Sequence, residues 1–223
     1  MNREEDSTMR TTVTYLFDPL CGWCYGASPK IQQLGQHPGI QLELLPSGLF
    51  SGGGRTMDAA FADFAWANDV RIAKLTGQRF TEAYRQNVLG RHGSRFDSGP
   101  ATLALTAVSL TEPLRELETL KLLQDARYVQ GLDTCNVSVV GKLLRDAGLA
   151  VAADRLVAND AELHQASAVR VQRAQRLMHA LGAQGVPALV LKGQDGNRLL
   201  NGNVLYGSFA SLLGHLVAVS EQN

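Results

Sequence analysis

The sequence predicts an α/β fold in which one mixed central sheet is built from both ends of the chain and interrupted by an all-helical insertion. Strand-like segments lie near the N-terminus and between residues 187 and 200, and the long middle part has the periodicity of helices. Neither end alone has enough strands to form a sheet. We therefore expect core segments at residues 10–55 and 181–220 and a helical insertion at residues 56–180.

The N-terminal part has the pattern of a strand, a helix and a second strand. Residues 13–17 are β-branched and aromatic and stop at Asp18-Pro19, which is typical of a buried strand ended by a turn. Residues 22–36 repeat apolar side chains at helical spacing, and residues 40–46 alternate apolar and polar side chains. This order of elements predicts a βαβ unit. The Gly-rich segment that follows, residues 47–55, is expected to be a loop, with a smaller chance that it lines a binding groove.

Helical periodicity and end signals predict the insertion. The expected helices lie near residues 61–77, 101–110, 114–123, 137–147 and 160–181. The residues that suit helix starts or ends are Pro100, Pro113, Asn136, Gly77, Gly148 and Gly182. We interpret the leucine stripe at positions 114, 117, 120 and 123 as core packing.

After the insertion the strand pattern returns. Residues 187–191 and 198–200 flank Gly193-Gln-Asp-Gly196, which predicts a β-hairpin, and a last helix is expected at residues 208–219. The C-terminal core segment should therefore read ββα.

Composition narrows the function classes. The 223 residues are 45% hydrophobic, and 21 Lys and Arg balance 21 Asp and Glu, so the net charge is zero. This balance gives no general electrostatic reason to bind nucleic acid or an anionic membrane. The first nine residues are charged and polar, and no segment approaches the roughly 18 consecutive apolar residues of a spanning helix. We expect a cytoplasmic protein.

The chemistry-bearing motif is Cys21-Gly-Trp-Cys24, placed where the first strand hands over to the first helix. A thiol at a helix N-terminus lies close to unpaired N–H groups that favour its thiolate, and Cys-x-x-Cys pairs at helix starts have a lowered first pKa. Cys21 would be the nucleophile and Cys24 the resolving thiol. Trp23 would shape the substrate-facing surface.

Two other interpretations of the pair are open. Cys-x-x-Cys is also a zinc half-site, but the five histidines show no paired spacing and Cys135 is alone, so we expect no metal. The pair could also be an inert structural feature. Cys135 is interpreted as a small core residue.

Pro187 follows Gly185-Val186 and opens a strand. From the residues alone, this proline could simply protect an edge or end a loop.

The Cys-x-x-Cys helix, the helical middle and the Val-Pro step occur in an order that resembles the DsbA family of thioredoxin-fold dithiol-disulfide oxidoreductases, in particular its FrnE-like branch without a signal peptide. The resemblance covers nearly the whole chain and implies a thioredoxin-like core with a DsbA-like helical insertion. It implies that Cys21 attacks, that Cys24 is a buried resolver, and that Pro187 is cis and faces the active-site sulfur. The backbone of Val186 would pair with an extended substrate.

This sequence departs from the family pattern in two places. Gly22-Trp23 stands where periplasmic relatives have Pro-His, so the imidazole that stabilises their thiolate is missing and a weaker oxidant is expected. Tyr15 replaces a buried acid of the family. Asp18 is expected to cap the turn before Pro19, and a part for it in proton transfer is left open.

The predicted function is a protein disulfide reductase or isomerase that acts through a mixed disulfide on protein or small-molecule disulfides. The redox-active pair needs no other cofactor, and glutathione is a possible electron partner. One alternative is a glutathione-dependent isomerase or transferase similar to the kappa-class and 2-hydroxychromene-2-carboxylate isomerase relatives, which typically keep a serine at the nucleophile position. A second alternative is a chaperone-like peptide binder without catalysis.

Overall fold

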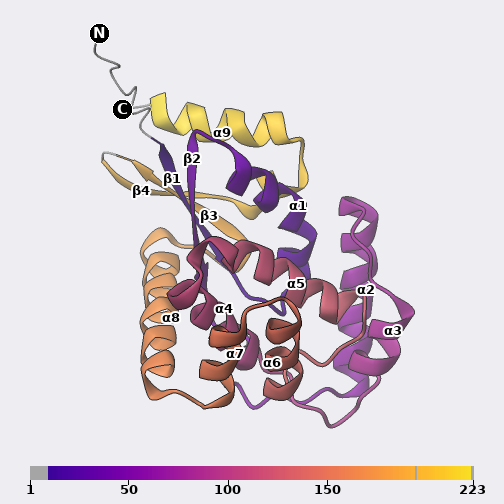
Figure 1. Ribbon diagram of the computed structural model, residues 1–223. Coiled ribbons are helices and arrows are strands. Elements are labelled where there is room, and N and C mark those ends of the chain that lie inside the picture. Colours follow the sequence, from indigo (N-terminus) through magenta and orange to yellow (C-terminus); the bar gives the residue numbers. More distant parts are fainter. Residues whose placement is uncertain (1–9, 194, 222–223) are drawn as a thin grey trace.

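A computed structural model of the chain describes residues 10–193 and 195–221 (Figure 1). Within these ranges a four-stranded sheet has the order β2-β1-β3-β4. The strands are β1 (Thr11–Phe17), β2 (Ile40–Pro46), β3 (Ala188–Gly193) and β4 (Gly196–Leu200). β1 pairs in parallel with β2 and antiparallel with β3, which pairs antiparallel with β4. Both ends of the chain build one mixed sheet, which confirms the predicted fold class.

Two of the sequence interpretations concern residues that lie partly outside the described ranges. The charged start of the chain, residues 1–9, lies outside the described residues, and so does Gln194 in the predicted hairpin turn. The hairpin itself is confirmed, because β3 and β4 pair as far as Gly193 and Gly196.

Helices fill the chain between β2 and β3. In chain order these are α2 (Ala59–Thr76), α3 (Glu82–Tyr84), a π-helical turn (Arg85–Leu89), α4 (Gly99–Thr111), a 3₁₀ turn (Pro113–Arg115), α5 (Glu116–Tyr128), α6 (Val137–Asp146), α7 (Ala150–Val157) and α8 (Ala161–Leu181). Outside this stretch lie α1 (Gly22–Gln36), a 3₁₀ helix (Gly202–Tyr206) and α9 (Phe209–Glu221). The sequence analysis missed the helical turns at residues 82–89 and helix α7.

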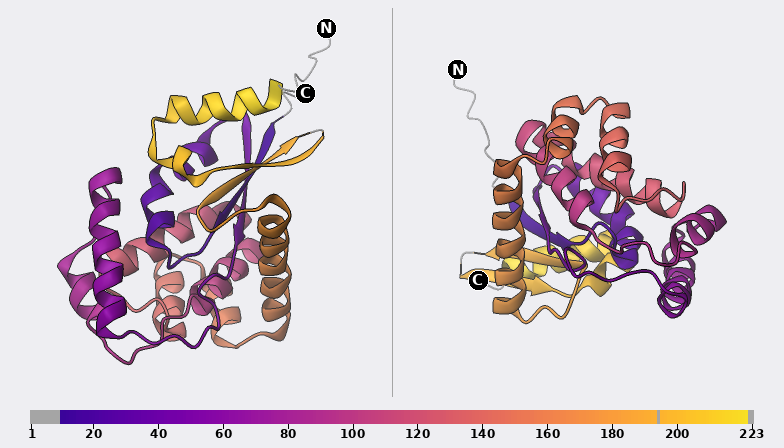
Figure 2. Two further views of the ribbon diagram at one scale, coloured as in Figure 1. Left: turned by 180° about the vertical axis from the view of Figure 1, so that it is seen from behind. Right: turned by 90° about the horizontal axis from the view of Figure 1, so that it is seen from below.

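Alternate residues of a strand point to opposite faces of the sheet, and here the side chains on each face pack against helices. Val13, Tyr15 and Phe17 of β1 belong to the large core that also contains buried residues of α1 and α9. Leu16 points the other way and packs with Ala174 of α8. Figures 1 and 2 show α1 and α9 on one side of the sheet, α8 on the other, and the remaining helices at one end.

The predicted helix ends are confirmed where local chemistry determines them. Asn136 accepts a hydrogen bond from the Ser138 amide at 2.8 Å and so caps α6. Gly77 and Gly182 end α2 and α8 with positive φ values of 75° and 67°. Pro100 lies in the first turn of α4.

Leu114 of the predicted leucine stripe is not part of the core, and neither is Val169 of α8. Leu114 is 98% exposed, because it lies in the 3₁₀ turn before α5, where the helical phase that buries Leu120 and Leu123 has not begun. Val169 is also exposed, since the buried positions of α8 include Leu163 and Ala174, and Val169 lies off that stripe.

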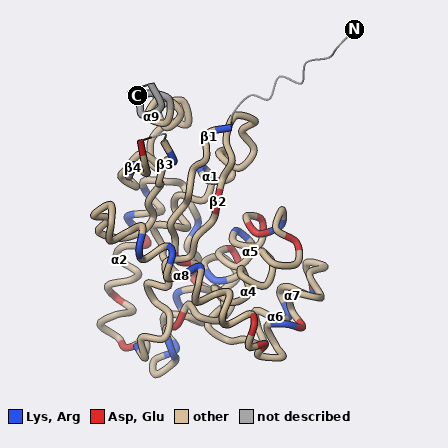
Figure 3. The backbone as a smooth tube through the Cα atoms, turned by 90° about the vertical axis from the view of Figure 1, so that its left-hand side faces the viewer, with Lys and Arg blue, Asp and Glu red and all other residues tan. Residues whose placement is uncertain are grey.

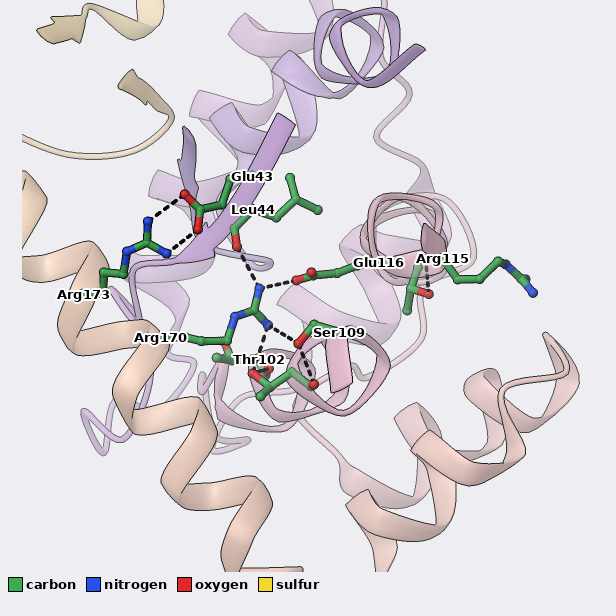
Figure 4. A network of polar contacts seen from close by, with 10 residues as sticks. Glu43, Leu44, Thr102, Ser109, Arg115, Glu116, Arg170 and Arg173 are labelled. Carbon is green, nitrogen blue, oxygen red and sulfur yellow. Dashed lines mark hydrogen bonds and ion pairs between the residues drawn. The ribbon is translucent and has the colours of Figure 1, made fainter. Parts of the chain in front are cut away.

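A polar network fastens α8 to the sheet and to the helical region (Figure 4). Arg170 donates to the Leu44 carbonyl of β2 at 2.8 Å and forms an ion pair with Glu116 at the start of α5. Its other terminal nitrogen donates to the hydroxyls of Thr106 and Ser109 on α4. One guanidinium therefore joins a strand and three helices.

Helix α8 was assigned to the insertion, yet it covers one face of the sheet, and its Arg173 also pairs with Glu43 of β2. The division at residues 10–55, 56–180 and 181–220 stays a prediction. Figure 3 shows basic and acidic positions interspersed along the chain, in keeping with the zero net charge. In the described ranges, no helix has the length and apolar character needed to cross a bilayer.

Candidate active site

Cys21 and Cys24 lie at the start of α1. The turn at Asp18-Pro19 ends β1, and the Cys21 amide donates to the Asp18 carbonyl at 3.1 Å, which places Cys21 at the N-cap position. Cys21 is 7% exposed, whereas Cys24 is fully buried one turn further in. Both are free thiols. Of the two sulfurs, that of Cys21 is nearer the surface, and the roles of attacking and resolving thiol stay a prediction.

The Val-Pro step lies directly opposite Cys21, although 165 residues separate them in the chain. The Val186-Pro187 peptide bond is cis, as predicted. The Cys21 thiol faces the Val186 carbonyl oxygen, with an Sγ to O distance of 3.6 Å. Thus the start of β3 and the start of α1 meet at the first sulfur.

A cavity of about 350 Å³ lies beside this meeting point. Its lining comes from Trp23, from the segment 182–188 and from residues around the end of β4 and the following 3₁₀ helix. Trp23, Val186 and Pro187 thus line the same cavity, and their part in substrate binding stays a prediction. The Gly-rich residues 52–54 do not line this cavity.

Tyr206 is a site residue that the sequence analysis missed. Its ring contacts Trp23 edge to face, with centroids 5.4 Å apart, and its hydroxyl donates to the Trp23 carbonyl at 3.0 Å. Burial, together with the two nearby cysteines, raises the pKa of Tyr206. In the sequence, Tyr206 is only an aromatic residue that follows the predicted hairpin. No local pattern indicates that it contacts Trp23.

Asp18 is buried at the end of β1 and accepts three hydrogen bonds. One carboxylate oxygen accepts from the Leu20 amide at 2.9 Å, which confirms the predicted turn cap. The other accepts from the Phe50 amide at 3.1 Å and from the Ser98 hydroxyl at 2.8 Å. Burial raises the pKa of Asp18, while these donors lower it. The carboxylate thus ties the end of β1 to two distant segments.

The environment of Cys24 opposes its ionisation. Burial is the main reason that the Cys24 pKa is raised, and the hydrogen bond to Cys21 and the charge of Asp18 act in the same direction. The Tyr15 hydroxyl, at the position where the family has an acid, donates to the Cys24 carbonyl at 3.4 Å. Cys24 is therefore a protonated thiol, which has to lose its proton before it can attack a mixed disulfide. A role for Asp18 in accepting that proton stays a prediction.

Cys135 lies apart from the pair, between α5 and α6. Its sulfur accepts from the Asp97 amide at 3.5 Å and faces Arg127 at 3.9 Å, and burial raises its pKa. Within the part of the chain that the structure describes, no three His, Cys, Asp or Glu residues gather in a way that could hold a metal ion.

Comparison with known families identifies the chain. Residues 12–214 match the DSBA-like thioredoxin domain. The chain belongs to this family. The DsbA-like fold and the disulfide oxidoreductase class predicted from the sequence are thereby confirmed for this DSBA-like protein.

Solved structures show the same relationship. The cytosolic disulfide reductase DsbM from Pseudomonas aeruginosa is 29% identical, with a TM-score of 0.82, and the match covers 93% of this chain and 99% of DsbM. DsbM with GSH matches over the same shares with a TM-score of 0.79. A candidate protein disulfide isomerase from Nitrosomonas europaea, 24% identical, has a TM-score of 0.80 over 96% of this chain and 99% of its own, and shows the fold. No significant match is found among curated proteins.

Proposed function

We propose that this DSBA-like protein is a cytosolic disulfide reductase or isomerase that acts through Cys21 and Cys24 on protein or small-molecule disulfides. The observation that carries the proposal is the placement of the two sulfurs. Cys21 faces the carbonyl oxygen of Val186, a residue that lines the cavity, while Cys24 is fully buried. The likeness to DsbM, which is named a cytosolic disulfide reductase, supports both the direction of electron flow and the compartment.

The exchange proceeds in two steps. The Cys21 thiolate attacks one sulfur of the substrate disulfide, a Cys21-substrate disulfide forms, and the other substrate sulfur leaves as a thiolate that takes up a proton. Cys24 then loses its proton and attacks Cys21, so that a Cys21-Cys24 disulfide forms and the second substrate thiol is released. The substrate gains two electrons and two protons, and the protein loses them.

Substrate binding uses the surface around the first sulfur. An extended disulfide-bearing segment would lie over Trp23 and pair with the backbone at Val186, next to Pro187, in the manner of an added strand. The Val186 carbonyl already lies 3.6 Å from the Cys21 sulfur, so a segment held there has its disulfide beside the nucleophile.

Glutathione is proposed as the electron donor that returns the pair to the dithiol form. Two glutathione molecules would reduce the Cys21-Cys24 disulfide and leave as one glutathione disulfide. A related protein, DsbM, has been solved with GSH, which supports this assignment and also keeps a glutathione-dependent isomerase or transferase as the second candidate. The relatives of that kind typically keep a serine at the nucleophile position, whereas this chain has cysteine at both 21 and 24.

Turnover and trapping of a glutathionylated peptide test the proposal. Cys21→Ser should abolish release of glutathione from the peptide, because the remaining thiol of the pair, Cys24, is fully buried. Cys24→Ser should accumulate a mixed disulfide, visible as a mass increase on Cys21, because nothing resolves it. Cys135→Ser is the matched control and should turn over as the wild type does. Activity that survives in Cys21→Ser would contradict the proposal, and peptide binding without turnover in the wild type would favour a non-catalytic peptide binder.

A further inference from the structure

A carboxyl group from the helical region lies against the Cys-x-x-Cys motif. Helix α1 has no acidic residue in its first turn, and no side chain caps it at Cys21. Asp69 of α2 supplies an acid there from outside. A Cβ atom added to Gly22, the residue after Cys21, would stand only 2.5 Å from the Asp69 Oδ1 atom. The space that a side chain at position 22 would use is therefore taken by this carboxyl group.

The surroundings hold Asp69 in this place. The side chain is almost wholly buried, since the residue is 5% exposed. The Tyr84 hydroxyl donates to the Asp69 Oδ2 atom at 3.0 Å, so one oxygen is fixed by α3 while the other faces Gly22. The Ile72 side chain, one turn along α2, also lies against Gly22, so two side chains of α2 pack at this position.

The charged and titratable groups around Asp69 come from three elements. The cysteine pair lies on α1, Tyr84 on α3, and Arg127 with Tyr128 on α5. Burial raises the Asp69 pKa to about 7, while the Tyr84 hydrogen bond and the charge of Arg127 lower it. Tyr128 feels both Asp69 and Cys21, because both raise its pKa. The carboxyl group therefore changes charge in the pH range in which thiols exchange.

A negative charge at this place lies at the N-terminal end of α1, where Cys21 is the N-cap residue. Unpaired N–H groups at a helix start stabilise one nearby anion, and a second anion beside it is repelled. Only the dithiol form of the pair can carry a thiolate. A group that disfavours the thiolate therefore shifts the equilibrium away from the dithiol and toward the disulfide.

We propose that Asp69 is a positioning residue for the dithiol chemistry: its carboxylate, held by Tyr84 against Gly22, disfavours the Cys21 thiolate and makes the Cys21-Cys24 pair a stronger reductant. The inference rests on the proposed function and deepens it, because it assigns the reducing direction to a residue of the helical region. It also explains why glycine follows Cys21.

The decisive experiment compares Asp69→Asn with the wild type in glutathione redox buffers from pH 5.5 to pH 9. At pH 8 the variant should shift the equilibrium constant about tenfold toward the dithiol, which corresponds to about 30 mV. The shift should shrink as the pH falls below about 7, where the wild-type carboxyl group is protonated. The pH profile of Cys21 alkylation should move to lower pH in the variant. Asp63→Asn, an exposed acid on the same helix, is the matched control and should change neither quantity.

Tyr84→Phe provides a second test that keeps the carboxyl group. Loss of the hydrogen bond raises the Asp69 pKa further, so this variant should resemble Asp69→Asn near pH 7 and the wild type near pH 9. An equilibrium constant in Asp69→Asn that equals the wild-type value at pH 8, or a shift that is the same at every pH, overturns the inference and leaves the proposed function standing. If Asp69→Asn does not fold, an unshifted Tyr84→Phe profile overturns it. A wild type with no couple overturns both proposals.

Discussion

Burial sets the acid-base behaviour of the individual residues around the cysteine pair. Asp18 and Asp69 are both buried acids with raised pKa values, but Asp18 accepts three hydrogen bonds and Asp69 has a single donor in Tyr84. Each donor stabilises the ionised form, so a carboxylate with fewer donors is costlier to bury. We therefore expect the ionisation of Asp69 near neutral pH to change the free energy of unfolding of the protein.

The stability of the protein should therefore depend on pH through Asp69. Its folded pKa of about 7 lies above the unfolded value, so the contribution to stability is full below about pH 4 and is lost as the pH rises through 7. The free energy of unfolding of the wild type, relative to Asp69→Asn, should fall between pH 4 and pH 8 by up to about 4 kcal/mol. Urea unfolding of both proteins at several pH values measures this difference. A difference that is constant over that range would show that Asp69 is ionised throughout.

At the scale of elements, the site depends on a close contact between the start of β3 and the 3₁₀ helix after β4. A Cβ atom added to Gly202 would stand 2.1 Å from the Pro187 carbonyl oxygen. Because that neighbour is backbone, it cannot turn aside as a flexible side chain could. The segment that places Val186 against Cys21 can therefore keep its position only if residue 202 has no side chain.

Gly202→Ala should push this segment away from the sulfur. We expect the protein to lose about 1–3 kcal/mol of stability and to turn over disulfide substrate more slowly. Gly207→Ala is the control in the same region, since its added Cβ would meet only the Val204 carbonyl oxygen at 3.9 Å. Thermal unfolding and glutathionylated-peptide turnover compare the two variants. Equal behaviour of both would show that the contact at Pro187 is not needed.

Local signals were sufficient for much of the fold. Strand alternation, the caps at Asn136 and Gly182 and the Asp18-Pro19 turn act within a few residues, so the sequence displays them directly. The short helix α7 escaped notice because its eight residues show barely two turns of periodicity.

The candidate site was predictable only in part. The cysteine pair is a local motif, and Pro187 was assigned through family resemblance. Tyr206 and Asp69 reach the motif from far along the chain, by contacts with Trp23 and Gly22 that tertiary packing alone creates. No pattern around either residue could have indicated those contacts.

At the scale of the whole molecule, a buried ion pair joins the sheet to the helical region. The Arg170 and Glu116 side chains are 16% and 10% exposed, and Arg170 also donates to β2 and α4. Burial raises the pKa of Glu116, while the charge and the hydrogen bond of Arg170 lower it. Loss of one partner would leave an uncompensated charge inside the protein.

Arg170→Met should therefore destabilise the protein by about 3–5 kcal/mol, and a second change, Glu116→Met, should recover part of that loss. Arg145→Met is the matched control, because the Arg145 and Asp154 side chains are 47% and 71% exposed and a surface pair contributes at most about 1 kcal/mol. Denaturant unfolding measures all three variants. A loss in Arg170→Met no larger than in Arg145→Met would contradict the account.

The central claim is that Cys21 and Cys24 form one two-electron redox couple, and a titration in glutathione buffers followed by tryptophan fluorescence tests it most directly. The chain has two tryptophans, so a Trp66→Phe background leaves Trp23, between the two sulfurs, as the reporter. The account predicts a single two-electron transition that is lost in Cys21→Ser, with a midpoint between about −270 and −120 mV. No transition, or one that persists without Cys21, would contradict it.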